Sequence, residues 1–149
     1  MHEPIQLDVT VPVAPEQAFD AFVLRINDWW PMASYSFRKG TVAMEPKLGG
    51  FITETGPDGD SFTWGHVTRW DRPELLELAW YVGRTVETAT QVTVTFQHDG
   101  DATRITLVQS GWEALGDAAA EMRTRNIAGW RSILGDHFVD FISHLQETG

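Results

Sequence analysis

A few side chains in this sequence combine types and spacings that could perform chemistry, and one group of them lies near the carboxyl terminus. His137, Asp140 and His144 are spaced i, i+3 and i+7, so on a helix they share one edge. Imidazole and carboxylate groups arranged in this way can bind a metal ion. We expect a surface coincidence instead, because the sequence offers no evident partner to orient the histidines and a helix end favours histidine for its dipole alone. The sequence therefore predicts no metal site.

Arg123 is the second candidate, because it falls near the centre of the apolar face of a predicted terminal helix at about 100° per residue. One interpretation is that its guanidinium anchors a carboxylate or phosphate of a ligand. The other is a salt bridge to Glu54 or Glu113, and we favour it because buried charges are usually paired. In both cases a charge at this position needs a partner.

His66 is the third candidate, on a predicted strand. Strict alternation places it on one face with Phe62, Trp64 and Trp70, where a lone histidine is more often a hydrogen-bonded core residue than an acid, a base or a ligand. His66 with Glu54 is the one pair that we can nominate for a cofactor-free enzyme. The sequence contains no Gly-rich phosphate loop before a helix, no Gly-x-Ser-x-Gly and no His-Glu-x-x-His. It therefore nominates no catalytic residue and no cofactor, and the balance leans against an enzyme.

Aromatic side chains supply the strongest compositional signal, since seven tryptophans occur in 149 residues. Each indole buries a large area, and its N–H needs a hydrogen-bond partner. An apolar pocket for a small ligand is one use for such a surplus, and a solid core is the other. The candidate lining residues are Trp30, Phe51, Trp64, Trp80, Trp112 and Trp130.

These side chains are positioned first of all by a long amphipathic helix, which we predict from Asp117 to Leu145 with Asp117 as its N-cap. The residues of its buried stripe recur every three or four positions, namely Met122, Asn126, Ile127, Trp130, Ile133, Leu134, His137, Phe138, Phe141 and Leu145. Gly129 and Gly135 interrupt this helix at a cost of roughly 0.8 to 1 kcal/mol each. A glycine beside Trp130 indicates that another backbone or a ligand comes close.

The rest of the chain predicts a sheet. Alternation from Ile5 to Val11 predicts a strand, and Pro15 then opens a short helix that is kinked near Asn27 and stopped by Pro31. A loop from Ser34 to Lys39 follows. Further strands are predicted around Val42 to Glu45, Phe51 to Thr55, Phe62 to Trp70, Leu76 to Val82, Val92 to Phe96 and Ile105 to Leu107. This order predicts an α+β fold in a single domain covering residues 1–149.

The overall charge narrows the choice of partners. Lys plus Arg number 11 against 21 Asp plus Glu, which gives a formal charge of −10. Such a field repels phosphate backbones, so we expect no nucleic-acid partner. Cysteine is absent, which excludes disulfides and thiolate chemistry. We also expect a cytoplasmic protein without membrane insertion, because the first ten residues lack the features of a secretory signal and no apolar run is long enough to cross a bilayer.

Seven short motifs occur in a recognisable order. They are Trp29-Trp30-Pro31, Glu45-Pro46 to Gly49-Gly50, Trp64-Gly65-x-Val67, Asp71-x-Pro73, Leu78-x-Trp80, Gly111-Trp112-Glu113 and Arg123-x-x-Asn126-x-x-Gly129-Trp130. Together they resemble the SRPBCC (START-like) superfamily, and within it proteins similar to the activator of the heat-shock protein 90 ATPase. The resemblance implies a helix-grip fold, in which a curved antiparallel sheet of about six to seven strands wraps the C-terminal helix and leaves a cavity.

The resemblance also implies a function, the binding of a small hydrophobic or amphipathic molecule in that cavity. The residues expected to contact the ligand are Trp30, Phe51, Trp64, His66, Trp80, Trp112, Arg123, Asn126 and Trp130. Asn126 stands where a larger residue is often found in the family, so we expect a wider cavity. The alternative function is a chaperone-associated protein-interaction module, and a cofactor-free enzyme is the third.

Overall fold

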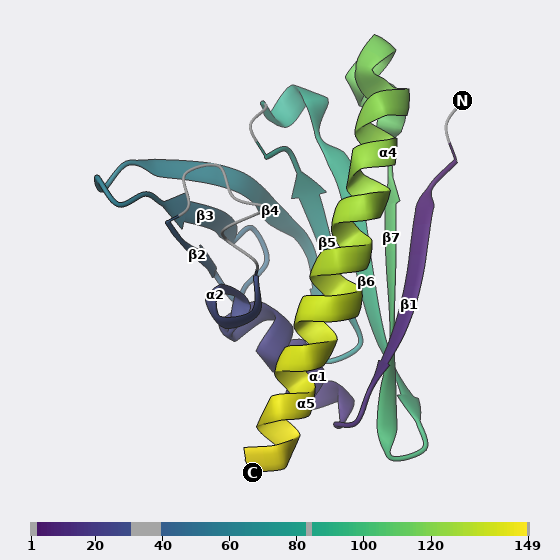
Figure 1. Ribbon diagram of the computed structural model, residues 1–149. Coiled ribbons are helices and arrows are strands. Elements are labelled where there is room, and N and C mark those ends of the chain that lie inside the picture. Colours follow the sequence, from purple (N-terminus) through teal and green to yellow (C-terminus); the bar gives the residue numbers. More distant parts are fainter. Residues whose placement is uncertain (1–2, 31–39, 83–84, 149) are drawn as a thin grey trace.

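The protein consists mainly of one curved sheet, and a long helix packs against it (Figure 1). The computed structural model describes residues 3–30, 40–82 and 85–148, so the predicted loop from Ser34 to Lys39 lies outside the described residues. In chain order the elements are β1 (Ile5–Val11), α1 (Pro15–Leu24), α2 (Ile26–Trp29), β2 (Thr41–Met44), β3 (Phe51–Thr55), β4 (Ser61–Asp71), β5 (Leu75–Trp80), η1 (Val86–Thr88), β6 (Thr90–Asp99), β7 (Ala102–Ser110), η2 (Trp112–Ala118), α4 (Ala119–Trp130), η3 (Arg131–Phe138) and α5 (Val139–Thr148). Among the described helices, none is long and apolar enough to cross a membrane.

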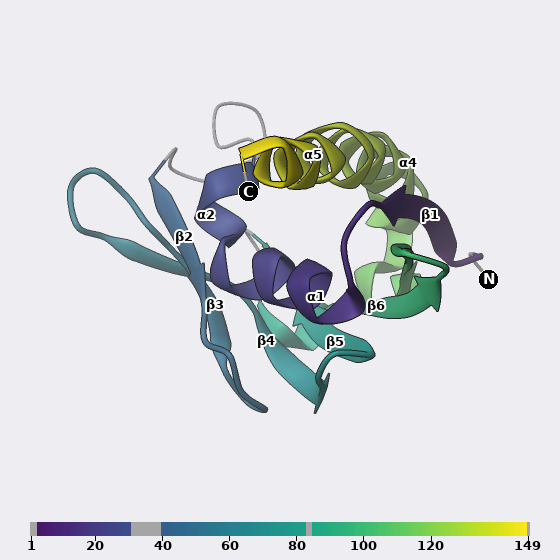
Figure 2. The same ribbon diagram turned by 90° about the horizontal axis from the view of Figure 1, so that it is seen from below.

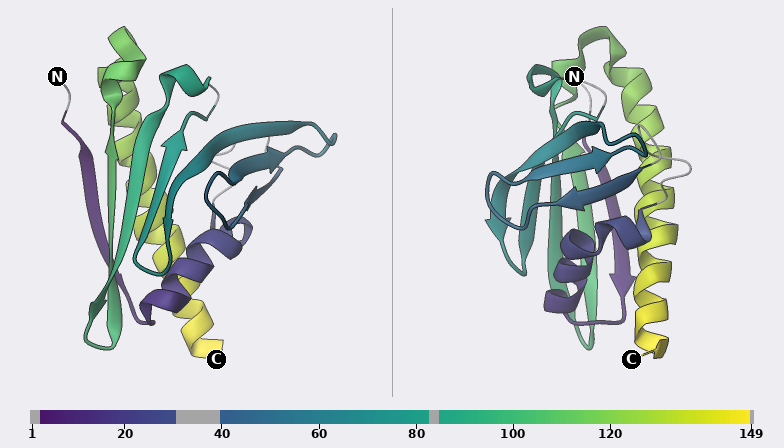
Figure 3. Two further views of the ribbon diagram at one scale, coloured as in Figure 1. Left: turned by 180° about the vertical axis from the view of Figure 1, so that it is seen from behind. Right: turned by 90° about the vertical axis from the view of Figure 1, so that its left-hand side faces the viewer.

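The sheet has seven strands in the order β1, β7, β6, β5, β4, β3, β2, and each neighbouring pair is antiparallel. It curls around the helices, with α1 and α2 near one end and the long helix across the open side (Figure 2). Figure 3 shows that this helix runs along the whole height of the sheet. The predicted helix-grip fold is confirmed. The predicted kink near Asn27 is found two residues earlier, at Arg25 between α1 and α2.

The terminal helix is continuous but not uniform. It begins at Ala119, two residues after the predicted N-cap Asp117, because residues Trp112–Ala118 form the separate turn η2 with a non-helical Gly116. Its middle part, Arg131–Phe138, is π-helical, and α5 then continues the helix to Thr148. Hydrogen bonds in a π-helix span five residues instead of four, so the helix carries more residues per turn here. The sequence pattern alone did not predict this segment.

Two β-bulges change which side chains of β4 face inward. Ile52 pairs with Gly65 whereas Thr53 pairs with Thr63, so Trp64 is an extra residue on its strand. A second shift follows between Val67 and Arg69. A bulge reverses the alternation of side chains beyond it, because two residues then oppose one. The inward and outward positions of β4 therefore differ from those that strict alternation predicts.

The end of the sheet near α1 is filled by aromatic rings. Phe19 packs edge-on against Phe96 with ring centroids 5.2 Å apart, and Phe22 lies 5.6 Å from Phe138. Trp29 contacts the same Phe138 at 4.8 Å. All five rings are buried, so this half of the protein is a solid apolar core that fixes α1, α2 and η3 to the sheet.

Gly135 lies in the π-helical segment with nothing within 4 Å of the position that a Cβ would take. Gly135→Ala is therefore expected to stabilise the protein by about 0.4 to 1 kcal/mol, because alanine loses less conformational entropy on folding. Gly65→Ala is the matched control and should destabilise it, since a Cβ there would lie 2.1 Å from the Ala79 carbonyl oxygen. Urea denaturation measures both changes. A destabilised Gly135→Ala protein would show that the π-helical segment needs the freedom of glycine.

Candidate functional site

Four tryptophans from distant parts of the chain meet on the concave side of the sheet. Trp30 follows α2, Trp64 and Trp80 lie on β4 and β5, and Trp130 ends α4. The ring centroids of Trp30 and Trp64 are 5.0 Å apart, and those of Trp80 and Trp130 are 5.5 Å apart. Trp30 also lies 6.0 Å from Trp80 and 5.9 Å from Trp130. These four indoles, hereafter the tryptophan cluster, are each less than a tenth exposed.

A buried carboxylate holds one side of the tryptophan cluster. Glu54 on β3 is 0% exposed, and its Oε1 accepts a hydrogen bond of 3.1 Å from Trp64 Nε1. Its Oε2 accepts one of 3.0 Å from the backbone N–H of Gly40. Both oxygens therefore have donors, which offsets part of the cost of removing the carboxylate from water.

A chain of neutral hydrogen bonds holds the other side. Trp130 Nε1 donates to Gln109 Oε1 at 2.7 Å, and Gln109 Nε2 donates to Thr90 Oγ1 at 2.8 Å. The Thr90 hydroxyl donates in turn to the carbonyl oxygen of Trp80 at 3.2 Å. Gln109 and Thr90 are buried on β7 and β6. This chain connects the Trp130 indole to the backbone of Trp80 through the sheet.

Buried polar side chains are thus concentrated at one place. The described residues contain four buried polar or charged residues. Glu54 and Gln109 are bonded to indoles of the tryptophan cluster, and Thr90 is bonded to Gln109 and to the backbone carbonyl of Trp80. The fourth, Thr103, donates to the carbonyl of Val13 instead. Sequence reasoning did not nominate Thr90 or Gln109. Strand parity could have found them, because Thr90 continues the inward series of Val92 and Val94, and Gln109 that of Ile105 and Leu107.

Two of the predicted aromatic lining residues lie elsewhere. Trp112 is fully buried in a second core cluster with Ile5 and Ala119, and its indole donates to the Gln109 carbonyl at 3.2 Å. Phe51 is 50% exposed and packs against His66, with ring centers 6.2 Å apart. The structure therefore brings together four of the six predicted aromatic residues.

His66 faces the outer side of the sheet, so its predicted place beside Trp64 is wrong. It pairs with Ala79, whereas the neighbouring Val67 pairs with the buried Leu78. The bulge at Trp64 is the cause, because it reverses the alternation before His66. His66 Nδ1 instead lies 3.1 Å from the hydroxyl of Tyr81, and burial raises the pKa of that phenol above its usual value. Glu54 is buried on the concave face, so the predicted pairing of His66 with Glu54 is also wrong.

Arg123 and Asn126 lie on α4 away from the tryptophan cluster. Arg123 is half-buried and donates to the backbone carbonyls of Glu3 and Pro4, not to the predicted Glu54 or Glu113. Asn126 is also half-buried, and its Nδ2 donates a hydrogen bond of 2.7 Å to the Met122 carbonyl of the same helix. The helical wheel put both side chains on the correct face. Few sheet residues lie beneath this part of the helix, whose single fully buried side chain before Gly129 is Ala119.

The outer surface has hollows and charge pairs of its own. His137, Asp140 and His144 border a hollow of about 240 Å³ with Asp28, and no group of three in the described chain is arranged to hold a metal ion. A wider groove of about 1000 Å³ lies between the start of α1, the β4–β5 turn and the end of β6. Beside it Arg72 donates twice to Asp20, and these hydrogen bonds hold the pKa of the Asp20 carboxyl below its ordinary value.

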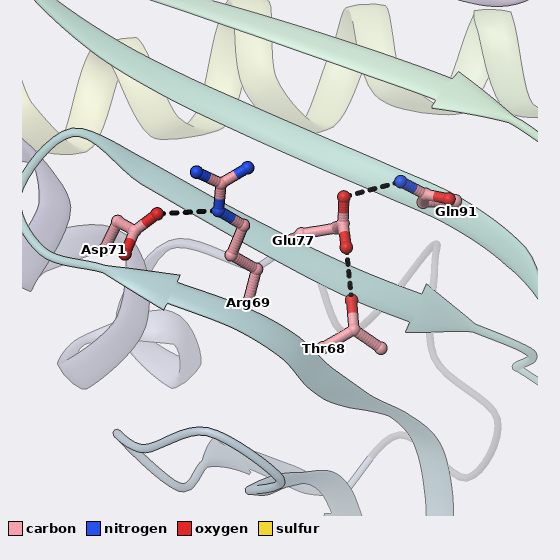
Figure 4. A network of polar contacts seen from close by, with 5 residues as sticks. All are labelled: Thr68, Arg69, Asp71, Glu77 and Gln91. Carbon is pink, nitrogen blue, oxygen red and sulfur yellow. Dashed lines mark hydrogen bonds and ion pairs between the residues drawn. The ribbon is translucent and has the colours of Figure 1, made fainter.

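Polar side chains also connect three strands on the outer face of the sheet (Figure 4). Glu77 on β5 accepts hydrogen bonds from Thr68 on β4 and Gln91 on β6, at 3.0 and 2.6 Å. Arg69 pairs with Asp71 at 2.6 Å on the same face. All of these contacts are exposed, so they contribute little to stability individually. The long helices lie behind the sheet in this view, so the outer face is not covered by them.

The fold agrees with one protein family. A family model described as activator of Hsp90 ATPase homolog 1-like protein matches residues 12–143. The chain belongs to this family. The SRPBCC-type resemblance is thereby confirmed, and members of this superfamily bind hydrophobic ligands. No curated protein sequence matches the chain.

Solved structures show the same relationship. The anthrahydroquino-gamma-pyrone synthase Txn09 is 29% identical with a TM-score of 0.61, over 80% of this chain and 83% of that one. CalC from Micromonospora echinospora, a self-sacrificing resistance protein, is 27% identical with a TM-score of 0.69, over 95% of this chain and 94% of its own. The protein MLL2253 from Mesorhizobium loti is 15% identical with a TM-score of 0.68 over 98% of both chains, and so shares the fold alone.

Proposed function

We propose that this protein binds a small hydrophobic or amphipathic molecule between the concave face of the sheet and the C-terminal helix, against the tryptophan cluster. One observation carries the proposal: of the four buried polar side chains of the described residues, Glu54 and Gln109 accept hydrogen bonds from indoles of the cluster, and Thr90 is bonded to Gln109 and to the backbone carbonyl of Trp80. An apolar core does not require such groups, because a buried polar atom costs free energy unless it finds a hydrogen-bond partner. Aromatic walls with a few placed polar groups are typical of small-molecule sites.

The residues that we propose to contact the ligand are fewer than those expected from the sequence. Trp30, Trp64, Trp80 and Trp130 remain, because they form one surface. Phe51 and His66 lie together at the outer side of the sheet, and Arg123 binds backbone near β1. One solved structure also supports this proposal, since Txn09, described as an anthrahydroquino-gamma-pyrone synthase, is 29% identical to this chain.

Tryptophan fluorescence tests the proposal, because a ligand at this position lies against several indoles. Titration with a panel of fatty acids, flat aromatic ketones and aromatic acids should quench the emission and raise the melting temperature for at least one class. Trp80→Phe should weaken that binding, whereas Trp70→Phe, which changes a ring packed on Phe19 outside the tryptophan cluster, should not. If fluorescence and melting temperature stayed unchanged across the panel, the proposal would be wrong.

A second candidate is a chaperone-associated interaction module, which the description of the family favours. Its surface would be the outer face of the sheet around Arg69 and Glu77, which the long helices leave uncovered. Both functions are proposed for a cytoplasmic protein. The interaction module predicts that purified chaperone binds the protein and that its ATPase rate changes, and that reversing the charges of Arg69 and Glu77 abolishes both effects. An unchanged ATPase rate with no complex formed would eliminate this candidate.

A further inference from the structure

Gln109 joins the two core clusters of the protein through its backbone and its side chain. Its carbonyl oxygen accepts from Trp112, which belongs to the smaller cluster around Ile5. Its side chain lies between Trp130 and Thr90 at the tryptophan cluster. Gln109 is 0% exposed, so each polar atom of this amide must find its partner inside the protein.

The orientation of the Gln109 amide follows from its neighbours. An indole N–H can only donate, so the atom that lies 2.7 Å from Trp130 Nε1 must be the carbonyl oxygen of the amide. The amide nitrogen therefore faces Thr90. The Thr90 hydroxyl donates its hydrogen to the Trp80 carbonyl, so it accepts from Gln109 Nε2. Every donor and acceptor direction in this chain is fixed.

In this orientation, one N–H of the Gln109 amide has no hydrogen-bond acceptor among the described residues. An amide nitrogen carries two hydrogens, and Thr90 accepts one of them. Among the described residues, no other acceptor is bonded to Gln109 Nε2. A buried donor without an acceptor costs about 1 to 3 kcal/mol, so such a group in a folded protein points to a bound partner.

We propose that Gln109 donates this second hydrogen to the carbonyl oxygen of a flat aromatic ligand, and that the natural ligand is a neutral aromatic ketone. The inference rests on the proposed function, because it requires a ligand against the tryptophan cluster. Indole faces favour a flat aromatic molecule. A ketone oxygen accepts from an amide N–H without a counter-charge, whereas a ligand carboxylate buried at this cluster would require one.

Fluorenone and fluorene provide the test, since they have the same three-ring shape and differ in a single carbonyl oxygen. Wild-type protein should bind fluorenone roughly 3- to 10-fold more tightly than fluorene, the size expected for one neutral hydrogen bond. The infrared carbonyl stretch of bound fluorenone should lie at a lower frequency than that of fluorenone in an apolar solvent without hydrogen-bond donors. Gln109→Met, which keeps the length of the side chain but removes the donor, should abolish both the preference and the shift.

Thr103→Val is the matched control, because it also removes a buried hydrogen bond, the one to the Val13 carbonyl, at a position away from the tryptophan cluster. It should retain the preference for fluorenone. If Gln109→Met does not fold, Gln109→Leu removes the same donor with a shorter apolar side chain.

The outcomes separate this inference from the proposed function. Equal affinities of the wild-type protein for fluorenone and fluorene would overturn the role of Gln109 and leave aromatic binding in place. A preference that survived in Gln109→Met, or in Gln109→Leu, would overturn it as well. If neither compound bound the wild-type protein but a fatty acid did, the ketone class would be wrong and the proposed function would stand. If no member of the panel bound, both would be wrong.

Discussion

Trp130→Ala is expected to lower the free energy of unfolding by about 3 to 5 kcal/mol, the usual cost of removing a large aromatic side chain from a packed core. The indole is 3% exposed and contacts Trp30 and Trp80 at 5.9 and 5.5 Å. Its N–H also satisfies Gln109, which would lose that donor. Such a loss is large against a total stability of roughly 5 to 15 kcal/mol. Urea denaturation followed by circular dichroism measures it.

Trp70→Ala provides the comparison for this experiment. Trp70 is half-buried and packs on Phe19 with centroids 5.1 Å apart, outside the tryptophan cluster. Its loss should therefore cost less than that of Trp130. A Trp130→Ala protein as stable as wild type would mean that this indole borders empty space, and ligand binding would then be the property to measure.

Removing the Glu54 side chain should have an effect of similar size. Glu54→Ala leaves Trp64 Nε1–H and the Gly40 N–H without these acceptors and opens a cavity, so we expect a loss of about 3 to 5 kcal/mol. Glu54→Gln keeps the volume and one acceptor oxygen, so its loss should be smaller. Chemical denaturation and the near-ultraviolet circular dichroism of the indoles report both changes. Equal stabilities of the two variants would show that the hydrogen bonds of Glu54 contribute little.

Sequence periodicity was enough to predict the α+β order of elements, whereas the helix-grip arrangement followed from the family resemblance. Alternation in segments such as Ile5 to Val11 and the three-to-four spacing of the terminal stripe depend on local geometry, and both patterns survive in the structure except at His137, which is exposed. The π-helical segment could not be predicted in this way, because its residues continue the same apolar stripe. The predicted N-cap was wrong as well. Asp117 is a residue type that caps helices, but it lies within η2, before the helix begins.

The site was only partly predictable. Trp64 and Trp130 were expected to lie in one place because both fall on apolar faces, and they do. His66 was misplaced because a bulge has no dependable sequence signal, yet it moves every later side chain to the opposite face. Arg123 was misplaced because a helical wheel shows which way a side chain points and not how far the sheet extends beneath it. The positions of these side chains depend on contacts between segments that are distant in the sequence, which local patterns do not report.

The position of β1 beside β7 has a consequence for folding during synthesis. Asp8 on β1 reaches Arg104 and Thr106 on β7, partners that lie 96 and 98 residues later in the chain. The first strand therefore leaves the ribosome long before β7, the strand that it pairs with. Until β7 has been synthesised, the inward side chains of β1 cannot pack in the core. Trp130 emerges later still, so the tryptophan cluster assembles only after the sheet can close. A nascent chain stalled before β7 should then be sensitive to protease in β1, and release of the full chain should protect it.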